Sequence, residues 1–248
     1  MWQRKGKLWY FFVPYCLSTC SNCLKGQNNY LKQFLAHETS YLAHLLNLEM
    51  APTLSSCSLC SQQDPIFRCL DCYGQHLLCK DCLIKSHVQH PFHRPQQWKE
   101  GSFEKVSLCD LGYVFNLGHS GSGPPCPEND NLFGDRLMTM VHFNGVFEHC
   151  VRFCRCKGAS SDHEQLFVHR LFPSTFDRPE TAFTFDLLDC YEIDAVECKT
   201  SAQSFFHKLR RFTNNAFPDD VPVGLAICFI SLNIKLTLIN KEPISGTY

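Results

Sequence analysis

The fold of this chain is decided by a short stretch that reads Cys57-x2-Cys60, Cys69-x2-Cys72 and Cys79-x2-Cys82, followed by His87, His90 and His93. A gap of two residues lets a tight turn aim both sulfurs of a pair at one ion. Cysteine and histidine together are the ligands that tetrahedral zinc prefers. The sequence therefore predicts a small module that binds two zinc ions.

These ligands can be connected sequentially or in an interleaved way. In the interleaved version one ion is held by the first and third cysteine pairs, Cys57, Cys60, Cys79 and Cys82. The other ion is held by Cys69, Cys72 and two of the three histidines. The order of ligands is similar to that of B-box and ZZ-type fingers, and this likeness implies the interleaved, cross-brace arrangement. A disulfide framework is the alternative, but cysteine pairs with trailing histidines favour metal.

The composition indicates an intracellular protein. The 248 residues include 17 cysteines, an odd number, so they cannot all pair within one chain, and reduced thiols are typical of the cytosol or nucleus. A formal net charge of -1 gives no overall attraction to nucleic acid. We expect no membrane segment, since residues 223–239 are apolar but too short and too polar to span a bilayer.

Helical spacing of apolar side chains appears twice outside the module. Residues 30–49 show it before Pro52 ends the pattern, and we expect this helix to pack against the module, with partner binding as the alternative. A second helix is predicted from Ala202 to Phe212, capped by Ser201. Its basic residues are expected to complement the helix dipole and face water, with phosphate contact as the alternative, and these are Lys208, Arg210 and Arg211.

Strand signals lie between these helices. Two apolar runs, Leu137–Phe143 and Val146–Phe153, flank Asn144-Gly145, which predicts a hairpin with positive φ at both turn residues. A further strand is predicted from Leu166 to Leu171, ending at Pro173.

A third zinc site is suggested by cysteines after the hairpin. In an extended strand Cys154 and Cys156 would point to one face, and His119 and Cys126 in the preceding Gly- and Pro-rich loop could complete the site. The alternative is two small apolar residues on a sheet face and an ordinary loop histidine. The role of the early cysteines is left open, namely Cys16, Cys20 and Cys23.

Basic residues around the module are candidate nucleic-acid contacts. The four are Arg68, Lys80, Lys85 and Arg94. A solvated face that offsets the charge of zinc–thiolate centres is the alternative. An acidic cluster could bind magnesium, but a solvated face on or near an apolar element is the favoured explanation. Its members are Asp186, Asp189, Glu192 and Asp194.

Several signatures along the chain point to one family. They are Phe67-Arg68-Cys69-x2-Cys72, Leu117-Gly118-His119 ahead of Cys126-Pro127, Asn144-Gly145 ahead of Phe153-Cys154-x-Cys156, and Pro179-x-Thr181-Ala182-Phe183-Thr184-Phe185. From about Tyr30 to Asn215 the chain resembles the CxC-like cysteine cluster that precedes the catalytic domain in KDZ (Kyakuja/Dileera/Zisupton) transposases of fungi. Within that resemblance the ligand histidines are His87 and His93, whereas His90 does not match.

The expected organisation is α+β, with four parts. These are an N-terminal helical segment (1–53), the two-zinc module (54–100), a cysteine-cluster domain with a β-hairpin and a C-terminal helix (101–215), and a divergent tail (216–248). The resemblance stops before the catalytic domain of such transposases. It therefore implies a non-catalytic nuclear accessory region that binds transposon-end DNA or assembles with transposase subunits. A zinc-dependent module that reads histone or ubiquitin-pathway partners is the alternative.

Overall fold

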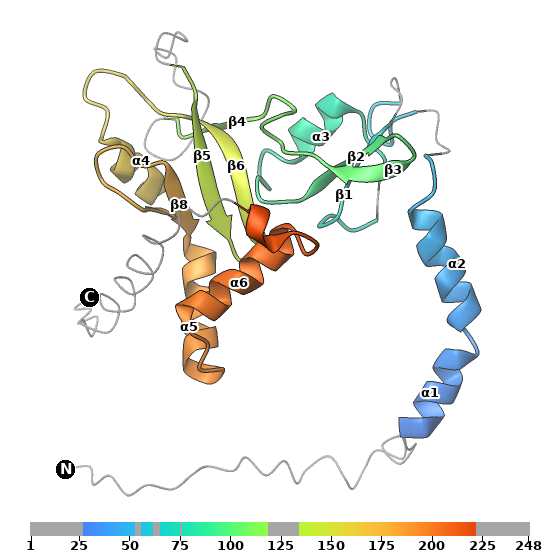
Figure 1. The fold of residues 1–248 in the computed structure, drawn as a ribbon. Coiled ribbons are helices and arrows are strands. Elements are labelled where there is room, and N and C mark those ends of the chain that lie inside the picture. The colour runs from blue at the N-terminus through green and yellow to red at the C-terminus, as the bar shows by residue number, and fades with distance from the viewer. Residues whose placement is uncertain (1–26, 53–55, 62–64, 75, 119–133, 222–248) are drawn as a thin grey trace, which may run out of the picture. The chain divides into compact units, whose positions relative to one another are not determined.

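A computed structural model describes residues 27–52, 56–61, 65–74, 76–118 and 134–221 (Figure 1). Six α-helices and two β-sheets occur in these residues, so the expected mixed α+β class is confirmed. Among the described helices there is none with the length and apolar character that crossing a membrane requires. The chain divides into two compact units, Met1–Ala51 and Pro52–Tyr248, and each is described by itself.

The first unit contains two short helices, α1 (Gln27–Leu35) and α2 (Glu38–Leu48). The prediction of one continuous helix over residues 30–49 is therefore wrong. The break lies at Ala36-His37, where the His37 N–H bonds to the Phe34 carbonyl at 2.8 Å, a spacing of three residues. Glu38 then places a negative charge in the first turn of α2, which favours a helix start at that point. Packing of this segment on the module stays a prediction.

The second unit begins with a three-stranded antiparallel sheet in the order β1-β2-β3. Its strands are β1 (Phe67–Cys69), β2 (Pro95–Lys99) and β3 (Ser102–Lys105). The short helix α3 (Lys80–Ser86) connects β1 to β2. Phe67, Leu78 and Leu83 are buried together with Leu108 and Tyr113 from the following segment, so the module and the start of the next sheet share one apolar core.

The larger sheet has the strand order β4-β6-β5-β8-β7. The strands are β4 (Val114–Asn116), β5 (Arg136–His142), β6 (Gly145–Arg152), β7 (Leu171–Pro173) and β8 (Thr181–Thr184). Alternating side chains give each face its own core. Val141 and Phe183 are buried with residues of α5 (Phe185–Glu197) and α6 (Ala202–Thr213), whereas Met140 and Ala182 are buried with Leu166 of α4 (Asp162–Val168).

The predicted hairpin is confirmed, but its turn lies one residue earlier than expected. β5 and β6 pair antiparallel with His142 opposite Gly145, so Phe143 and Asn144 form the turn. Asn144 is not among the described residues with positive φ. A glycine is needed at position 145 because α6 passes close to the backbone there. A Cβ on this residue would lie 3.1 Å from the Thr213 hydroxyl of α6.

Helix α4 corrects the strand predicted at Leu166–Leu171. Residues 162–168 are helical, and only Leu171–Pro173 is a strand. A capping box begins the helix, since the Ser161 backbone N–H donates to a Glu164 carboxylate oxygen at 3.0 Å. This Ser-x-x-Glu signal is present in the sequence and outweighs the β-propensity of Phe167 and Val168.

Helix α6 confirms the predicted C-terminal helix and its cap, because Ser201 Oγ accepts from the Ser204 backbone N–H at 3.1 Å. Two of its three basic side chains do not simply face water. Arg210 is buried and pairs with Asp219 at 3.0 Å, and Lys208 pairs with Asp194 of α5. These ion pairs fix α6 to its neighbours.

Candidate metal centres

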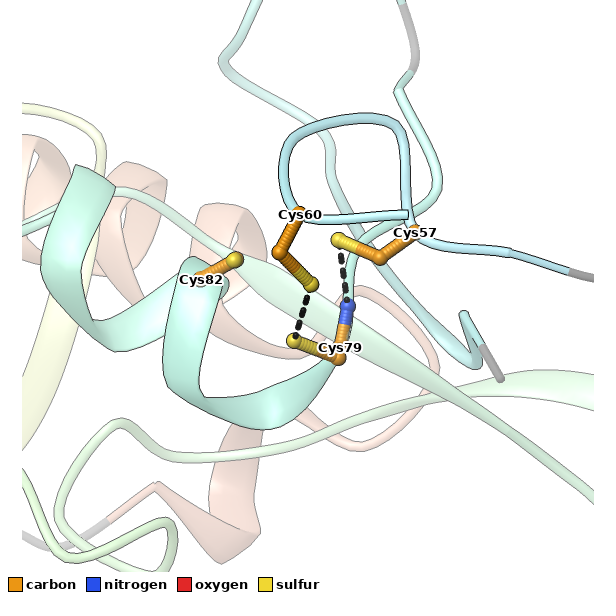
Figure 2. A group of neighbouring side chains, drawn as sticks. All are labelled: Cys57, Cys60, Cys79 and Cys82. Atoms are coloured by element: carbon orange, nitrogen blue, oxygen red, sulfur yellow. Dashed lines mark hydrogen bonds between the residues drawn. The ribbon is translucent and has the colours of Figure 1, made fainter. Parts of the chain in front are cut away.

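The first cluster gathers the first and third cysteine pairs (Figure 2). The Sγ atoms of Cys57, Cys60, Cys79 and Cys82 all lie within 4.8 Å of one another. Cys57 and Cys60 sit on a turn closed by the Ser61 N–H, which donates to the Cys57 carbonyl at 2.9 Å. Ser61 has a φ of 60°, which bends the chain back after the second sulfur.

The other two sulfurs of this cluster come from the start of α3. Cys79 precedes the first helical residue, and Cys82 lies in the first turn. The Cys79 backbone N–H donates to the Cys57 Sγ at 3.3 Å. Cys57 and Cys79 are buried, and the Sγ atoms of Cys60 and Cys79 are 3.8 Å apart. Tetrahedral zinc with bonds of ~2.3 Å places two sulfurs about 3.8 Å apart, so this spacing fits the ion.

The thiols of this cluster do not ionise easily together. Burial acts to raise the pKa of Cys57, but hydrogen bonds from the backbone N–H groups of Cys60 and Cys79 outweigh it and lower the pKa to about 6. The pKa of Cys82 is raised to about 12, first by hydrogen bonding with the Cys79 thiol and then by burial. A cation at the centre would compensate the negative charge that these sulfurs carry as ligands.

The second cluster gathers Cys69, Cys72, His87 and His93, whose ligand atoms also lie within 4.8 Å of one another. The Cys72 Sγ is 3.3 Å from His93 Nδ1 and 3.5 Å from His87 Nε2. The Cys69 Sγ is 3.7 Å from His93 Nδ1. These separations are those of neighbouring corners in a tetrahedron of two sulfurs and two nitrogens around zinc.

Contacts around the second cluster orient its ligands. The Asp71 carboxylate, between the two cysteines, binds the Arg94 guanidinium, with Oδ1 2.6 Å from Arg94 Nη2. Asp71 also accepts from the Arg94 backbone N–H at 2.6 Å, which ties the Cys69–Cys72 turn to the residue after His93. Burial lowers the pKa of His87 and of His93, and this favours the neutral imidazole that binds metal.

His90 lies outside this cluster. Its ring stacks on that of His93 with centroids 4.8 Å apart, and its side chain is exposed. The structure thus groups the ligand atoms in the interleaved way, with the outer two histidines and without His90.

The third candidate site is only half described. His119 and Cys126 lie outside the described residues, as do Cys16, Cys20 and Cys23. Cys154 and Cys156 follow the end of β6 at Arg152, so the expectation that one strand carries both is wrong. Within the part of the chain that the structure describes, they belong to no group of metal-ligand side chains.

The four basic residues proposed as a nucleic-acid patch do not form one surface. Arg68 is buried, donates to Gln96 Oε1 at 2.7 Å and stacks on the Phe103 ring at 3.7 Å, so it cannot contact phosphate. Arg94 is engaged by Asp71. Lys80 and Lys85 on α3 are exposed. The acidic residues Asp186 and Asp194 pair with basic side chains instead of forming a metal-type group.

A disulfide that the cysteine pattern did not reveal joins Cys109 to Cys150. Cys109 precedes β4, and Cys150 lies on β6. The expectation of reduced thiols therefore does not hold for these two cysteines. Neither residue belongs to a Cys-x2-Cys pair, and this separates the disulfide from the two clusters.

A comparison with known protein families gives a match over the larger sheet and its helices. Residues 108–217 match the family described as CxC2 like cysteine cluster associated with KDZ transposases. The resemblance seen in the sequence is confirmed for this region. The matched residues 108–217, called the CxC2 region below for this similarity, include the larger sheet, α4, α5 and α6, whereas the two clusters lie before them. No curated protein and no solved structure matched the chain.

Proposed function

We propose that this chain is a non-catalytic, zinc-binding accessory region of a KDZ-type transposase, in which two zinc ions cross-brace the module in the manner of B-box and ZZ fingers. The observation that carries the proposal is the presence of two four-ligand groups of suitable chemistry next to a CxC2 region. Cys₄ and Cys₂His₂ are the closed ligand sets of structural zinc sites, which leave no position for substrate. The metal would therefore supply folding energy and not catalysis.

Zinc would be needed for the module to fold. Residues 57–93 contribute few buried apolar side chains, Phe67, Leu78 and Leu83 among them, and such a small core rarely folds without a metal. The test is the zinc content of the native protein, followed by removal with a chelator. We expect zinc loss to expose the module to protease. An unchanged far-UV spectrum and digestion pattern after chelation would contradict the proposal.

The accessory role is better supported as assembly with protein than as DNA binding. Two of the four candidate cations are engaged within the module, Arg68 with Gln96 and Arg94 with Asp71. A cleft of about 970 Å³ lies where the module meets the CxC2 region, with Val106, Val146 and Phe217 in its wall. Apolar walls of this kind suit protein side chains more than phosphate groups.

Binding to duplex DNA over a series of salt concentrations separates the two versions. Phosphate contacts weaken steeply as salt rises, because bound counterions are released. For assembly with transposase subunits, we expect weak DNA binding that Lys80→Ala and Lys85→Ala do not change. Tight, strongly salt-dependent binding that these two substitutions abolish would instead assign DNA recognition to α3.

A second candidate function is a protein-interaction module that reads histone or ubiquitin-pathway partners. It is favoured by one observation, namely that both clusters precede the matched region 108–217. Fluorescence titration of the full chain with histone-tail peptides and with ubiquitin tests it. Saturable binding that is lost on chelation and changes little with salt would support this function over transposase assembly.

A further inference from the structure

The side chain of Phe92 packs on the larger sheet, although the residue lies in the zinc module. Phe92 directly precedes His93 of the second cluster. Its ring packs against the core that contains the buried side chains of Met140 of β5 and Val151 of β6. Four rings from three adjacent strands have centroids between 4.7 and 6.4 Å from that of Phe92, and they belong to Phe115 of β4, His142 of β5, and Phe147 and His149 of β6. Phe92 is therefore part of the packing of the β5–β6 hairpin.

The carbonyl oxygen of Phe92 is also bound to this hairpin. It accepts a hydrogen bond from Asn144 Nδ2 at 3.0 Å, and Asn144 lies in the turn between β5 and β6. Protein interiors are packed closely with few voids, so a shift of one side chain moves its neighbours. A displacement of Phe92 would therefore reach the hairpin twice, through the ring and through the carbonyl.

Two ligands of the second cluster lie on either side of Phe92 in the sequence. The segment from His87 to Arg94 follows α3, precedes β2 and contains no helix or strand. His87 and His93 both lie in this segment, and one ion that binds both restricts the conformations of the residues between them. The cysteine ligand Cys69 is the last residue of β1, so the same ion attaches the segment to that strand. The ion would thus fix the position of Phe92.

The first cluster has different neighbours. Its two buried cysteines, Cys57 and Cys79, share a core with residues that precede β4, namely Leu108, Leu111 and Tyr113. Among the residues that the structure describes, this core includes none from β5 or β6. The Cys109–Cys150 disulfide joins the segment before β4 to β6, but this bond does not involve an ion. Loss of the ion from the first cluster should therefore affect the hairpin less.

We propose that the two ions have different roles, and that Phe92 makes the position of the β5–β6 hairpin depend on the ion of the second cluster. This inference rests on the proposed zinc binding and adds a division of roles to it. Pro91 and His93 line the cleft of about 970 Å³, and so do Asn144 and Phe147 of the hairpin. The ion of the second cluster would thereby control the shape of the cleft proposed for protein assembly.

Hydrogen exchange of the full chain, followed by mass spectrometry of peptides that cover β5 and β6, tests this inference. Cys72→Ser and Cys60→Ser are a matched pair, because each removes the second cysteine of a Cys-x2-Cys pair and both residues are partly buried. Each variant should lose one zinc ion. Cys72→Ser should raise the exchange rate of the β5–β6 amides on the order of tenfold, the size of a typical coupling between two sites, whereas Cys60→Ser should leave it close to the native rate.

Phe92→Ala tests the link itself without removing a ligand. Because coupling between two sites is reciprocal, the variant should show faster hairpin exchange and should bind one of its two zinc ions on the order of tenfold more weakly in competition with a colorimetric chelator. Tyr73→Ala is the matched control, since Tyr73 follows the ligand Cys72 but its side chain is fully exposed, and it should keep both native values. Cys72→Ser combined with Phe92→Ala should exchange no faster than Cys72→Ser alone, because both changes act through one link.

The outcomes separate this inference from the proposed function. A native chain without zinc would contradict the proposed function, and with it the basis of the inference. Two bound ions in the native chain, together with native hairpin exchange in either Cys72→Ser or Phe92→Ala, would overturn the inference alone. Equal acceleration in Cys60→Ser and Cys72→Ser would overturn it as well, because the two ions would then have the same role. Additive acceleration in the combined variant would show that Phe92 is not the link.

Discussion

The Nδ1 atom of His87 lies 2.8 Å from the carbonyl oxygen of Leu83, one turn earlier in α3. Donation from Nδ1–H to this carbonyl leaves Nε2 with the lone pair, and Nε2 is the atom that faces Cys72 at 3.5 Å. The helix thus fixes the tautomer that a metal ligand requires. His93 uses the opposite nitrogen, Nδ1, toward Cys72 and Cys69.

Substitution of the histidines should separate ligands from bystanders. We expect His87→Ala and His93→Ala each to lower the zinc content by one ion per chain, because the second cluster loses a ligand. His90→Ala is the matched control and should keep the native content, since its ring only stacks on His93. Metal analysis of the three purified variants checks this. Loss of an ion from the His90 variant alone would reassign the ligand.

Cysteine substitutions should destabilise the module in preference to the CxC2 region. Cys79→Ser removes a buried ligand from the first cluster, and we expect the first-cluster zinc to be lost and residues 57–93 to become sensitive to protease. Cys198→Ser is the matched control, because Cys198 is exposed and lies at the end of α5. Digestion followed by mass spectrometry maps the cleavage sites. Equal sensitivity of both variants would show that Cys79 has no special role.

Local features of the fold could be predicted from the sequence, whereas long-range features could not. Spacing alone indicated the cysteine pairs, the hairpin around Asn144 and the helix capped by Ser201, because turns, caps and periodicity are local properties. The burial of Arg68 under Phe103 depends on how β1, β2 and β3 align, so the pattern of charges could not show it. The Cys109–Cys150 disulfide likewise depends on the position of β6, which spacing does not encode.

Two local features were missed although a signal was available. The helix break before Glu38 could have been inferred from Glu38 itself, because an acidic residue in the first turn favours a new helix start. The capping box of Ser161 and Glu164 marks the start of α4. In both cases the prediction followed the run of apolar residues and overlooked the residues at the helix start. The hydrogen bonds at the ends of a helix decide where it begins.

His149 should make the stability of the CxC2 region depend on pH. Its side chain is 1% exposed among aromatic rings, and in the described part of the chain its ring nitrogens have no hydrogen bond of ordinary geometry. Burial lowers its pKa from 6.5 to about 4, while the nearby Pro91 carbonyl acts in the opposite direction. Since the unfolded chain binds the proton more readily, stability should fall as the pH decreases from about 6.5 toward 4.

His149→Phe tests this pH dependence with a ring of similar size. At pH 5 the native protein should have lost about 2 kcal/mol relative to pH 7 through this residue alone, and the variant should retain that amount. Urea unfolding of both proteins at the two pH values measures the difference. An identical loss of stability in the variant would assign the pH dependence to other groups.

The Cys109–Cys150 disulfide should stabilise the CxC2 region. The two residues are 41 positions apart, and closing a loop of that length lowers the entropy of the unfolded chain, which is worth about 3–4 kcal/mol. A reductant that does not bind zinc should lower the melting temperature of the native protein. The double variant Cys109→Ser, Cys150→Ser should melt lower from the start and show no further response to reductant. A response that persists in this variant would point to another disulfide.

The most direct test of the central claim is the metal content of the native full chain, determined by elemental mass spectrometry after purification without chelators. The account predicts at least two zinc ions per chain, with one ion lost in Cys79→Ser and a different one lost in His93→Ala, so that the combined variant loses both. A native chain that carries no zinc, or single variants that each lose nothing, would contradict it.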